Sequence, residues 1–415
     1  MVLNMRKLLK VISAVCAAAL SAVLCSCNKT VPTVNLSVWA PAEKQATFEA
    51  IAQKFTEKYL NDAHFTITIS EEKEISCKET VISSPENAAD IFIFADDQLD
   101  DLNAAGALYD VSADAAAISE ACGNNPSAIE SITRGGKTFA YPLSAGNGYF
   151  LYYNSDYFTR KDVSDLDSIL DVCSENNKKF AMDFGSGWYI YSFFKGAGLD
   201  VGLNDDGLTN YCNFNSKDSK IKGVDVAEAM LRIASNDSFI SLGSDDLVAG
   251  VKDGSIIAGV SGTWNSEAIS QAYGDGYSAI KLPTYTVAGQ KVQMSSFTGY
   301  KLIGISAYSE NADWAMKFAA ELINEENQLE LFKKHGECPA NAAAAASDTV
   351  TASPAVKALS EQSEFAYIQR VADQYWDPTY VFGTIIAGKN PDNSDLQKLL
   401  DTMTEQITAA PESAE

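Results

Sequence analysis

The chain has 415 residues, of which 46% are hydrophobic, so it can form about two or three domains with substantial cores. Its 31 Lys and Arg residues stand against 55 Asp and Glu residues, which gives a net charge of −24. Such an acidic chain argues against binding to nucleic acid or to anionic lipid head groups. We interpret the charge mainly as a contribution to solubility.

The first residues have the pattern of a secretory signal. Met1–Lys10 carries cations and no acid, and Val11–Leu24 is an apolar run of about 14 residues, whereas a bilayer-spanning helix needs about 20. The segment Leu24–Cys27 resembles a bacterial lipoprotein cleavage box. Cys27 fits better than Cys25 as the lipidated thiol because a small serine precedes it. We expect cleavage before Cys27, with ordinary cleavage or a retained membrane helix as the alternatives.

Neither the cysteines nor the histidines predict a metal site. The cysteines that remain after Cys27 are odd in number and have no C-x-x-C spacing, so at most two disulfides could form among them. His64 and His335 have no second His or Cys at ligand spacing, and we interpret both as structural. The cysteines concerned are Cys77, Cys122, Cys173, Cys212 and Cys338.

Strand-like and helix-like apolar periods alternate along the chain after a short linker. Residues 34–38 alternate with period two, and residues 48–59 have helical spacing. A second strand follows at 65–69, and the run 89–94, apolar except for Asp90, is typical of a strand buried on both faces of a parallel sheet. The order strand, helix, strand predicts an α/β sheet.

Similar alternation returns in the rest of the chain, which suggests two α/β lobes. The alanine-rich stretch at 342–346, within 341–354, is interpreted as a surface crossing between elements. Further strands are expected at 149–153, 180–184, 255–261, 277–282 and 301–306, and further helices at 224–234, 313–323 and 395–407.

Aromatic residues beside turn residues are the main chemical signal. Trp39 ends the first predicted strand and Phe94 ends another, and each is followed by a polar loop. Because ligands bind beyond the carboxyl ends of strands in open α/β sheets, both loops should face one crevice. Other aromatic residues in turns are Trp188 with Tyr189, Trp264, and Tyr375 with Trp376.

This combination of side chains suits a sugar. A pyranose has an apolar face of C–H groups and a rim of hydroxyls, so flat aromatic rings can cover the face while carboxylates, amides and Lys bond to the rim. For each aromatic residue taken alone, packing in a core is the more common role. Several of them beside polar neighbours predict a cleft for a sugar longer than one ring.

Several strings of the sequence resemble, in the same order, the maltose- and maltodextrin-binding branch of the bacterial extracellular solute-binding proteins. They extend from about Val34 to Ala409, nearly the whole chain after the signal. The strings are LSVWAPAEK, AADIFIFADDQLDDLNAAGAL, FAYPLSAGNGYFLYYNSDYF, DGSIIAGVSGTWNSEAI and AIKLPTYTVAGQ, and the strings FGSGWYIYSFF and QYWDPTYVFG resemble forms from Gram-positive gut bacteria.

The resemblance implies a two-lobed α/β fold with a hinge, of the periplasmic-binding-protein type II. It implies a monomeric lipoprotein on the extracellular face of the membrane of a Gram-positive bacterium, attached to the membrane through the lipid anchor only. Such a protein binds an oligosaccharide and delivers it to the permease subunits of an ABC importer. It is not an enzyme and needs no cofactor, metal or nucleic acid.

The resemblance also implies a division of the chain. Residues 1–26 are the signal peptide, and residues 27–33 are the lipidated N-terminus and linker. Residues 31–145 plus 298–340 form the first lobe, and residues 146–297 plus 341–410 form the second. The chain is expected to cross between the lobes near Gly146, near Ser296 and at Pro339–Asn341.

The family's binding positions can be carried over residue by residue. The acid and lysine after the first strand fall on Glu43 and Lys44, and the hydroxyl-binding carboxylate after the third strand falls on Asp97. Many relatives have an acid where this chain has Asn147, which leaves the pattern of bound hydroxyls open. The last stacking aromatic is either Trp376 or Tyr380. The full set of ligand-binding candidates is Trp39, Glu43, Lys44, Phe94, Asp97, Asn147, Trp188, Tyr189, Trp264, Trp376 and Tyr380.

Three alternatives remain open from the sequence. The first is a glycoside hydrolase, which would need two carboxyl groups roughly 5–10 Å apart. Other enzyme classes are not favoured, because the sequence has no G-x-S-x-G, H-E-x-x-H, P-loop or G-x-G-x-x-G signature. A surface adhesin would be built from β-sandwich modules, which do not alternate helix and strand. The bound sugar could also be one other than maltodextrin.

Overall fold

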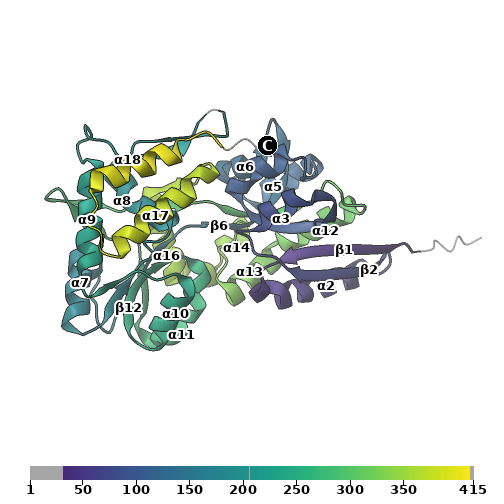
Figure 1. Ribbon diagram of the computed structural model, residues 1–415. Helices are drawn as coiled ribbons and strands as arrows, with labels where there is room; N and C mark the ends of the chain where they lie inside the picture. The colour runs from purple at the N-terminus through teal and green to yellow at the C-terminus, as the bar shows by residue number, and fades with distance from the viewer. Residues whose placement is uncertain (1–30, 205, 412–415) are drawn as a thin grey trace, which may run out of the picture.

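The computed structural model describes residues 31–204 and 206–411 of the chain. It has two lobes, each built around a five-stranded sheet, and Figure 1 shows them side by side with β1 and β2 at the far end of one lobe. This arrangement confirms the predicted two-lobed α/β fold. Cys27 and the predicted signal lie outside the described residues.

The first lobe has a mixed sheet with the strand order β2-β1-β3-β17-β6. β1 pairs in parallel with β2 and β3, while β17 is antiparallel to β3 and β6. The central strand β3 is buried over its first four residues, Ile91–Phe94, as expected for a strand covered on both faces of the sheet. The strands are β1 (Thr33–Ala40), β2 (His64–Glu71), β3 (Ile91–Ala95), β6 (Ala140–Ala145) and β17 (Tyr300–Ile305).

Aromatic rings fill one side of the core of the first lobe. Phe55 of the first long helix meets Phe318 edge to face at 5.3 Å between centroids, and Phe65 of β2 meets Trp314 at 4.9 Å. Helix and sheet therefore pack through large apolar side chains. The helices of this lobe are α2 (Gln45–Lys58), α3 (Cys77–Ser83), α4 (Leu99–Ala104), α5 (Ala115–Ala121), α6 (Pro126–Ile132), α12 (Ala312–Leu322) and α13 (Glu325–His335).

The second lobe repeats the plan with the strand order β11-β8-β12-β7-β13. β8 is parallel to β11 and β12, and β7 is antiparallel to β12 and β13. The strands are β7 (Phe150–Asn154), β8 (Lys179–Ala181), β11 (Phe239–Ile240), β12 (Ile256–Ser261) and β13 (Tyr277–Ile280). The helices are α7 (Leu166–Glu175), α8 (Gly187–Gly196), α9 (Gly223–Ser235), α10 (Ser244–Lys252), α11 (Ser266–Tyr273), α16 (Pro354–Gln362), α17 (Trp376–Ala387) and α18 (Leu396–Ile407).

Helix α17 lies directly on the loop that follows β8. A Cβ atom on Gly383 would be 1.8 Å from the carbonyl oxygen of Phe184, and one on Gly187 would be 2.2 Å from Oγ1 of Thr379. Only glycine at both positions allows this close approach. The contact fixes the start of α8 against the start of α17, which places the aromatic residues of both helices in one region.

The chain passes between the two sheets at three places. The first crossing runs from the end of β6 at Ala145 to the start of β7 at Phe150. The second follows β16 (Ser296–Thr298), which pairs with β18 (Ala366–Ile368) and leads into β17. The third runs from α13 to α14 (Ala342–Ala345). Gly146 has a φ of +68°, and a Cβ there would lie 2.4 Å from Cδ2 of Leu359. The alanine-rich stretch forms the short helix α14, and a second short helix, α15 (Asp348–Thr351), follows it.

All five cysteines of the described chain are free thiols, and four of them are buried. Within residues 31–204 and 206–411, none of the helices has both the length and the apolarity needed to cross a membrane.

Candidate functional site

The loops after β1 and β3 emerge at one edge of the first sheet. The two strands are parallel neighbours, with Trp39 in register with Phe92, so their carboxyl ends point the same way. The first loop leads into α2 with Glu43 and Lys44, and the second contains Asp97. In the second lobe, the segments after β8 and β12 carry Trp188 and Trp264.

Residues of both lobes line a hollow of about 240 Å³, which we call the Glu43 hollow. Glu43 is exposed at the start of α2, and Trp264 from the second lobe is half-buried and lines the same hollow. The indole lies close against Gly262, where a Cβ atom would be 2.0 Å from the ring. The hollow therefore brings together a carboxylate and an aromatic ring that are far apart in the sequence.

Lys44 borders the same hollow but is held in a buried cluster of four charges, the Lys44 quartet. Its Nζ lies 2.6 Å from Glu74 and 2.5 Å from Glu337, and Lys301 lies 3.0 Å and 2.9 Å from the same two carboxylates. Burial alone would raise the pKa of Glu337, but the nearby Lys301 and Lys44 outweigh it and lower that pKa. With only 2% of its surface exposed, Lys44 bonds to carboxylates and shapes the wall of the hollow.

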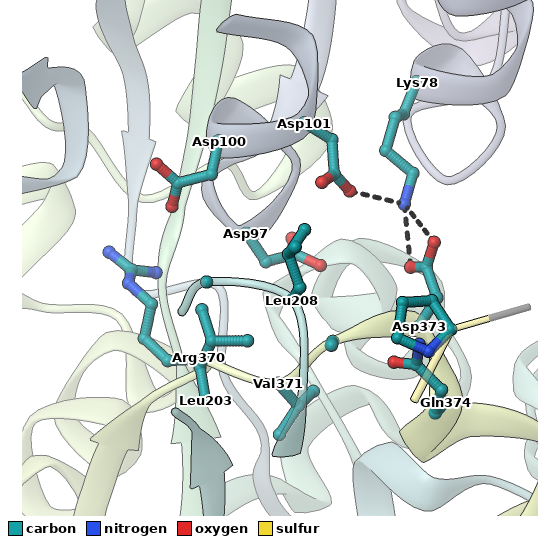
Figure 2. A pocket seen from close by; sticks show the side chains of 13 residues that line it. Lys78, Asp97, Asp100, Asp101, Leu203, Leu208, Arg370, Val371, Asp373 and Gln374 are labelled. Carbon is teal, nitrogen blue, oxygen red and sulfur yellow. Dashed lines mark hydrogen bonds and ion pairs between the residues drawn. The ribbon is translucent and has the colours of Figure 1, made fainter. Parts of the chain in front are cut away.

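Asp97 lines a second hollow between the lobes, of about 130 Å³, which we call the Asp97 hollow. Figure 2 shows Lys78 of the first lobe reaching Asp101 at 3.0 Å and Asp373 of the second lobe at 2.7 Å. Nε2 of Gln369, also in the second lobe, donates to Oδ2 of Asp97 at 2.8 Å. Polar contacts therefore join the two lobes at this end.

Burial raises the pKa of Asp97 to about 7, and the neighbouring negative charge of Asp96 adds to the effect. Burial also raises the pKa of Asp96, against the opposing charge of Arg370. Near neutral pH the acid form of Asp97 is therefore more accessible than that of an ordinary aspartate, beside the carboxylate form. In these two forms it can accept a hydrogen bond from a hydroxyl or donate one to it.

Trp188 and Tyr189 open α8 beside the crossing segments. The ring of Trp188 is 5.4 Å from Phe297 and 5.7 Å from Tyr149, and Tyr189 is 4.9 Å from Tyr149. Both side chains are half-buried, so part of each ring is accessible. Nearby, the backbone N–H of Asn147 donates to the carbonyl of Gly299 at 2.8 Å, which ties the first crossing to the second.

The two candidates for the last aromatic residue lie one turn apart on α17. Trp376 is half-buried and meets Tyr375 edge to face at 5.0 Å, whereas Tyr380 is 57% exposed. Both rings have free surface, so both stay candidates.

The remaining aromatic candidates belong to the first core. Phe94 is fully buried and packs 5.9 Å from Phe92, because β3 is covered on both faces. The sequence-based assignment of Phe94 to the binding surface is therefore corrected: its side chain supports the loop that carries Asp97. Trp39 is half-buried and packs partly against the same core.

Sequence reasoning missed polar groups of the second lobe. Asp183 is half-buried just after β8, and its Oδ1 accepts from the backbone N–H of Gly185 at 2.9 Å. The apolar pattern predicts a strand over residues 180–184, and this prediction conceals the carboxylate. The structure ends the strand at Ala181, and an acid directly after an apolar strand is the signal that could have identified it.

Comparison with known families gives a match over most of the chain. The sequence model of the family described as bacterial extracellular solute-binding protein matches residues 50–358. A galactooligosaccharide-binding protein of Bacillus subtilis (strain 168) is 28% identical over 276 residues, which are 62% of this chain and 64% of that protein. The match thus spans less than two thirds of the length of this relative.

Solved structures resemble the chain over nearly its full length. A protein in complex with acarbose is 26% identical, with a TM-score of 0.78, and covers 91% of this chain and 99% of its own. A maltodextrin-binding protein from L. casei BL23 without ligand is 24% identical, with a TM-score of 0.75, and covers 91% of this chain and 100% of its own.

Proposed function

Because the chain belongs to the family of bacterial extracellular solute-binding proteins, we propose that it captures a maltodextrin-type oligosaccharide between its lobes and delivers it to an ABC importer. A member of this family is a binding protein and not an enzyme. The permease subunits of the importer are the proposed partners, and the protein acts outside the cell as a monomer.

One observation carries this proposal: Glu43 of the first lobe and Trp264 of the second lobe line the same hollow. A sugar placed there would stack its apolar face on the indole and bond its hydroxyls to the carboxylate. Asp97 offers a second carboxyl group to hydroxyls at the other interlobe hollow. An aromatic ring and carboxyl groups on facing lobes are the groups that an oligosaccharide requires.

The relatives support two kinds of sugar. The acarbose complex and the maltodextrin-binding protein favour a maltodextrin, and they match over more than nine tenths of this chain. The relative from Bacillus subtilis favours a galactooligosaccharide, at a similar identity over a shorter match. Maltodextrin is our first candidate and galactooligosaccharide the second.

The proposed mechanism is closure of the lobes about the three crossing segments. A sugar that touches Glu43 and Trp264 gains both contacts only when the lobes approach, so it binds the closed state more tightly and shifts the population towards it. Ion pairs between the lobes, such as that of Lys78 with Asp373, would further stabilise the closed state. The permease can then recognise the surfaces of both lobes together, because closure fixes their position relative to each other.

Saturating maltotriose should decrease the radius of gyration of the protein in small-angle X-ray scattering. Tryptophan fluorescence should change over the same concentration range, because Trp264 lines the Glu43 hollow. Isothermal titration calorimetry with maltotriose and with a galactotriose would separate the two sugar candidates. A scattering curve that stays unchanged at saturation would exclude closure, and no heat with either sugar would reject the proposed ligand class.

We also propose that Cys27 carries the lipid that holds the protein at the outer face of the membrane. Two acyl chains on one thioether bind a membrane firmly, whereas one chain binds only marginally. Replacing Cys27 with Ala should release the protein into the medium, as measured by immunoblotting of cell and medium fractions. Retention of Cys27→Ala by the cells would instead indicate Cys25 or an uncleaved helix.

A further inference from the structure

A third hollow lies within the second lobe, away from the two interlobe hollows. It measures about 430 Å³, and we call it the outer hollow. The loop after β8, the end of β11 and the second half of α17 surround it. Its lining includes Gly185, Phe239, Ser241, Thr384, Gly388 and Lys389. Like the interlobe hollows, it lies beyond the carboxyl ends of parallel strands, here β8 and β11.

One face of α17 connects this hollow with the aromatic residues at the start of the helix. Trp376, Tyr380 and Thr384 are spaced four residues apart, so they share one face of the helix over about 12 Å. Gly185 joins this face to the loop after β8, because a Cβ there would be 3.8 Å from the ring of Tyr380 and 3.6 Å from Oγ1 of Thr384.

The polar group at this junction is Asp183. A Cβ on Gly185 would be 3.2 Å from its Oδ1, which accepts a hydrogen bond from the backbone N–H of Gly185. Among the residues of the described chain, no cation forms an ion pair with Asp183, and burial raises its pKa. The second carboxyl oxygen of Asp183 therefore has capacity for a hydroxyl donor.

The rest of the surface has the same chemistry as the proposed cleft. The ring of Tyr380 is 57% exposed, which leaves an apolar face for a pyranose. The exposed hydroxyl of Thr384 has no hydrogen-bond partner among the described residues and can bond to a sugar hydroxyl. Thr384 and Gly185 line the hollow, and Tyr380 and Asp183 lie next to it around Gly185, so a tyrosine, a carboxylate and a threonine are neighbours at its edge.

We infer that the outer hollow, together with Tyr380 and Asp183, is an outer saccharide subsite. It receives the end of an oligosaccharide that is too long for the space between the lobes. This inference rests on the proposed function, and it assigns to the protein a preference for longer chains. The ligand would extend along α17, so the two sites would be occupied by one molecule.

The test compares short and long sugars on a variant that fills the hollow. Thr384→Met adds volume at an exposed helix position without loss of helix propensity, and Thr351→Met is the matched control on the exposed end of α15. Calorimetry would use maltotriose with maltoheptaose, and galactobiose with galactotetraose. In the series that the wild-type protein binds, the longer sugar should bind about tenfold more tightly.

Thr384→Met should remove most of this difference and leave the affinity for the shorter sugar within about twofold of the wild-type value. Thr351→Met should behave like the wild-type protein. Equal wild-type affinities for short and long sugars would overturn the outer subsite while leaving the proposed function intact. So would an equal loss for both sugars in Thr384→Met. Absence of binding in both series would overturn the proposed function and the subsite together.

Discussion

Replacing Lys301 with Met should lower the free energy of unfolding by about 3–5 kcal/mol, because it leaves buried carboxylates without one of their two cations. Lys301 is 8% exposed and bonds to both Glu74 and Glu337. Lys44 alone would then face both acids. Urea denaturation of the ligand-free protein measures the change.

Two further variants test the cause of this loss. Lys54→Met removes an exposed ion pair with Glu326 on the same lobe, and it should cost no more than about 1 kcal/mol. The double variant Lys301→Met with Glu337→Gln removes one charge of each sign, so it should recover part of the stability lost in Lys301→Met. A loss below about 1 kcal/mol in Lys301→Met would show that water reaches the quartet and screens it.

The quartet should also make stability depend on acid pH. The pKa of Glu337 is lowered in the folded protein by Lys301 and Lys44. Its contribution is therefore fully present above its unfolded pKa of about 4.3 and is lost as the pH falls through the folded pKa. The difference in stability between the wild-type protein and Lys301→Met should shrink as the pH falls below about 4.

The quartet also shows where sequence reasoning ends. The family resemblance implies that Lys44 binds sugar hydroxyls, whereas in the structure its ammonium group pairs with two buried carboxylates. Its partners come from the loop after β2 and from the segment after α13, which no local pattern connects to Lys44. Buried ion pairs between distant segments depend on the tertiary fold, so composition and spacing cannot reveal them.

The fold itself was largely accessible from periodicity. Strands β1, β2, β3 and β12 and helices α2, α9, α12 and α18 lie where the apolar spacing predicts them. Helix α8 was not predicted, because its sequence WYIYSFF is apolar on every side and has no helical period. The strand predicted at 180–184 ends early at Ala181, since the following loop turns to meet α17 at Gly383.

Trp264 is the candidate that the structure places best for stacking, and Trp264→Ala should weaken binding of maltotriose about thirtyfold, or about 2 kcal/mol. Its indole lies close against Gly262 and lines the same hollow as Glu43. A ring already held against the backbone loses little freedom when a sugar covers its accessible surface. Truncation of Trp264 to Ala removes the indole, so the apolar face of the bound sugar is left in contact with water.

The measurement is calorimetric titration of Trp264→Ala with maltotriose, alongside Trp264→Phe and Tyr308→Ala. Phenylalanine keeps a smaller flat face, so its affinity should fall between those of the wild-type protein and the alanine variant. Tyr308 is a 55% exposed aromatic residue on the first lobe that lines neither interlobe hollow, so its loss should leave affinity unchanged. Trp264→Ala should still close around maltotriose in scattering, but only at higher sugar concentrations, because the other contacts between the lobes remain. Native circular dichroism with unaltered maltotriose affinity in Trp264→Ala would show that the sugar does not stack on this ring.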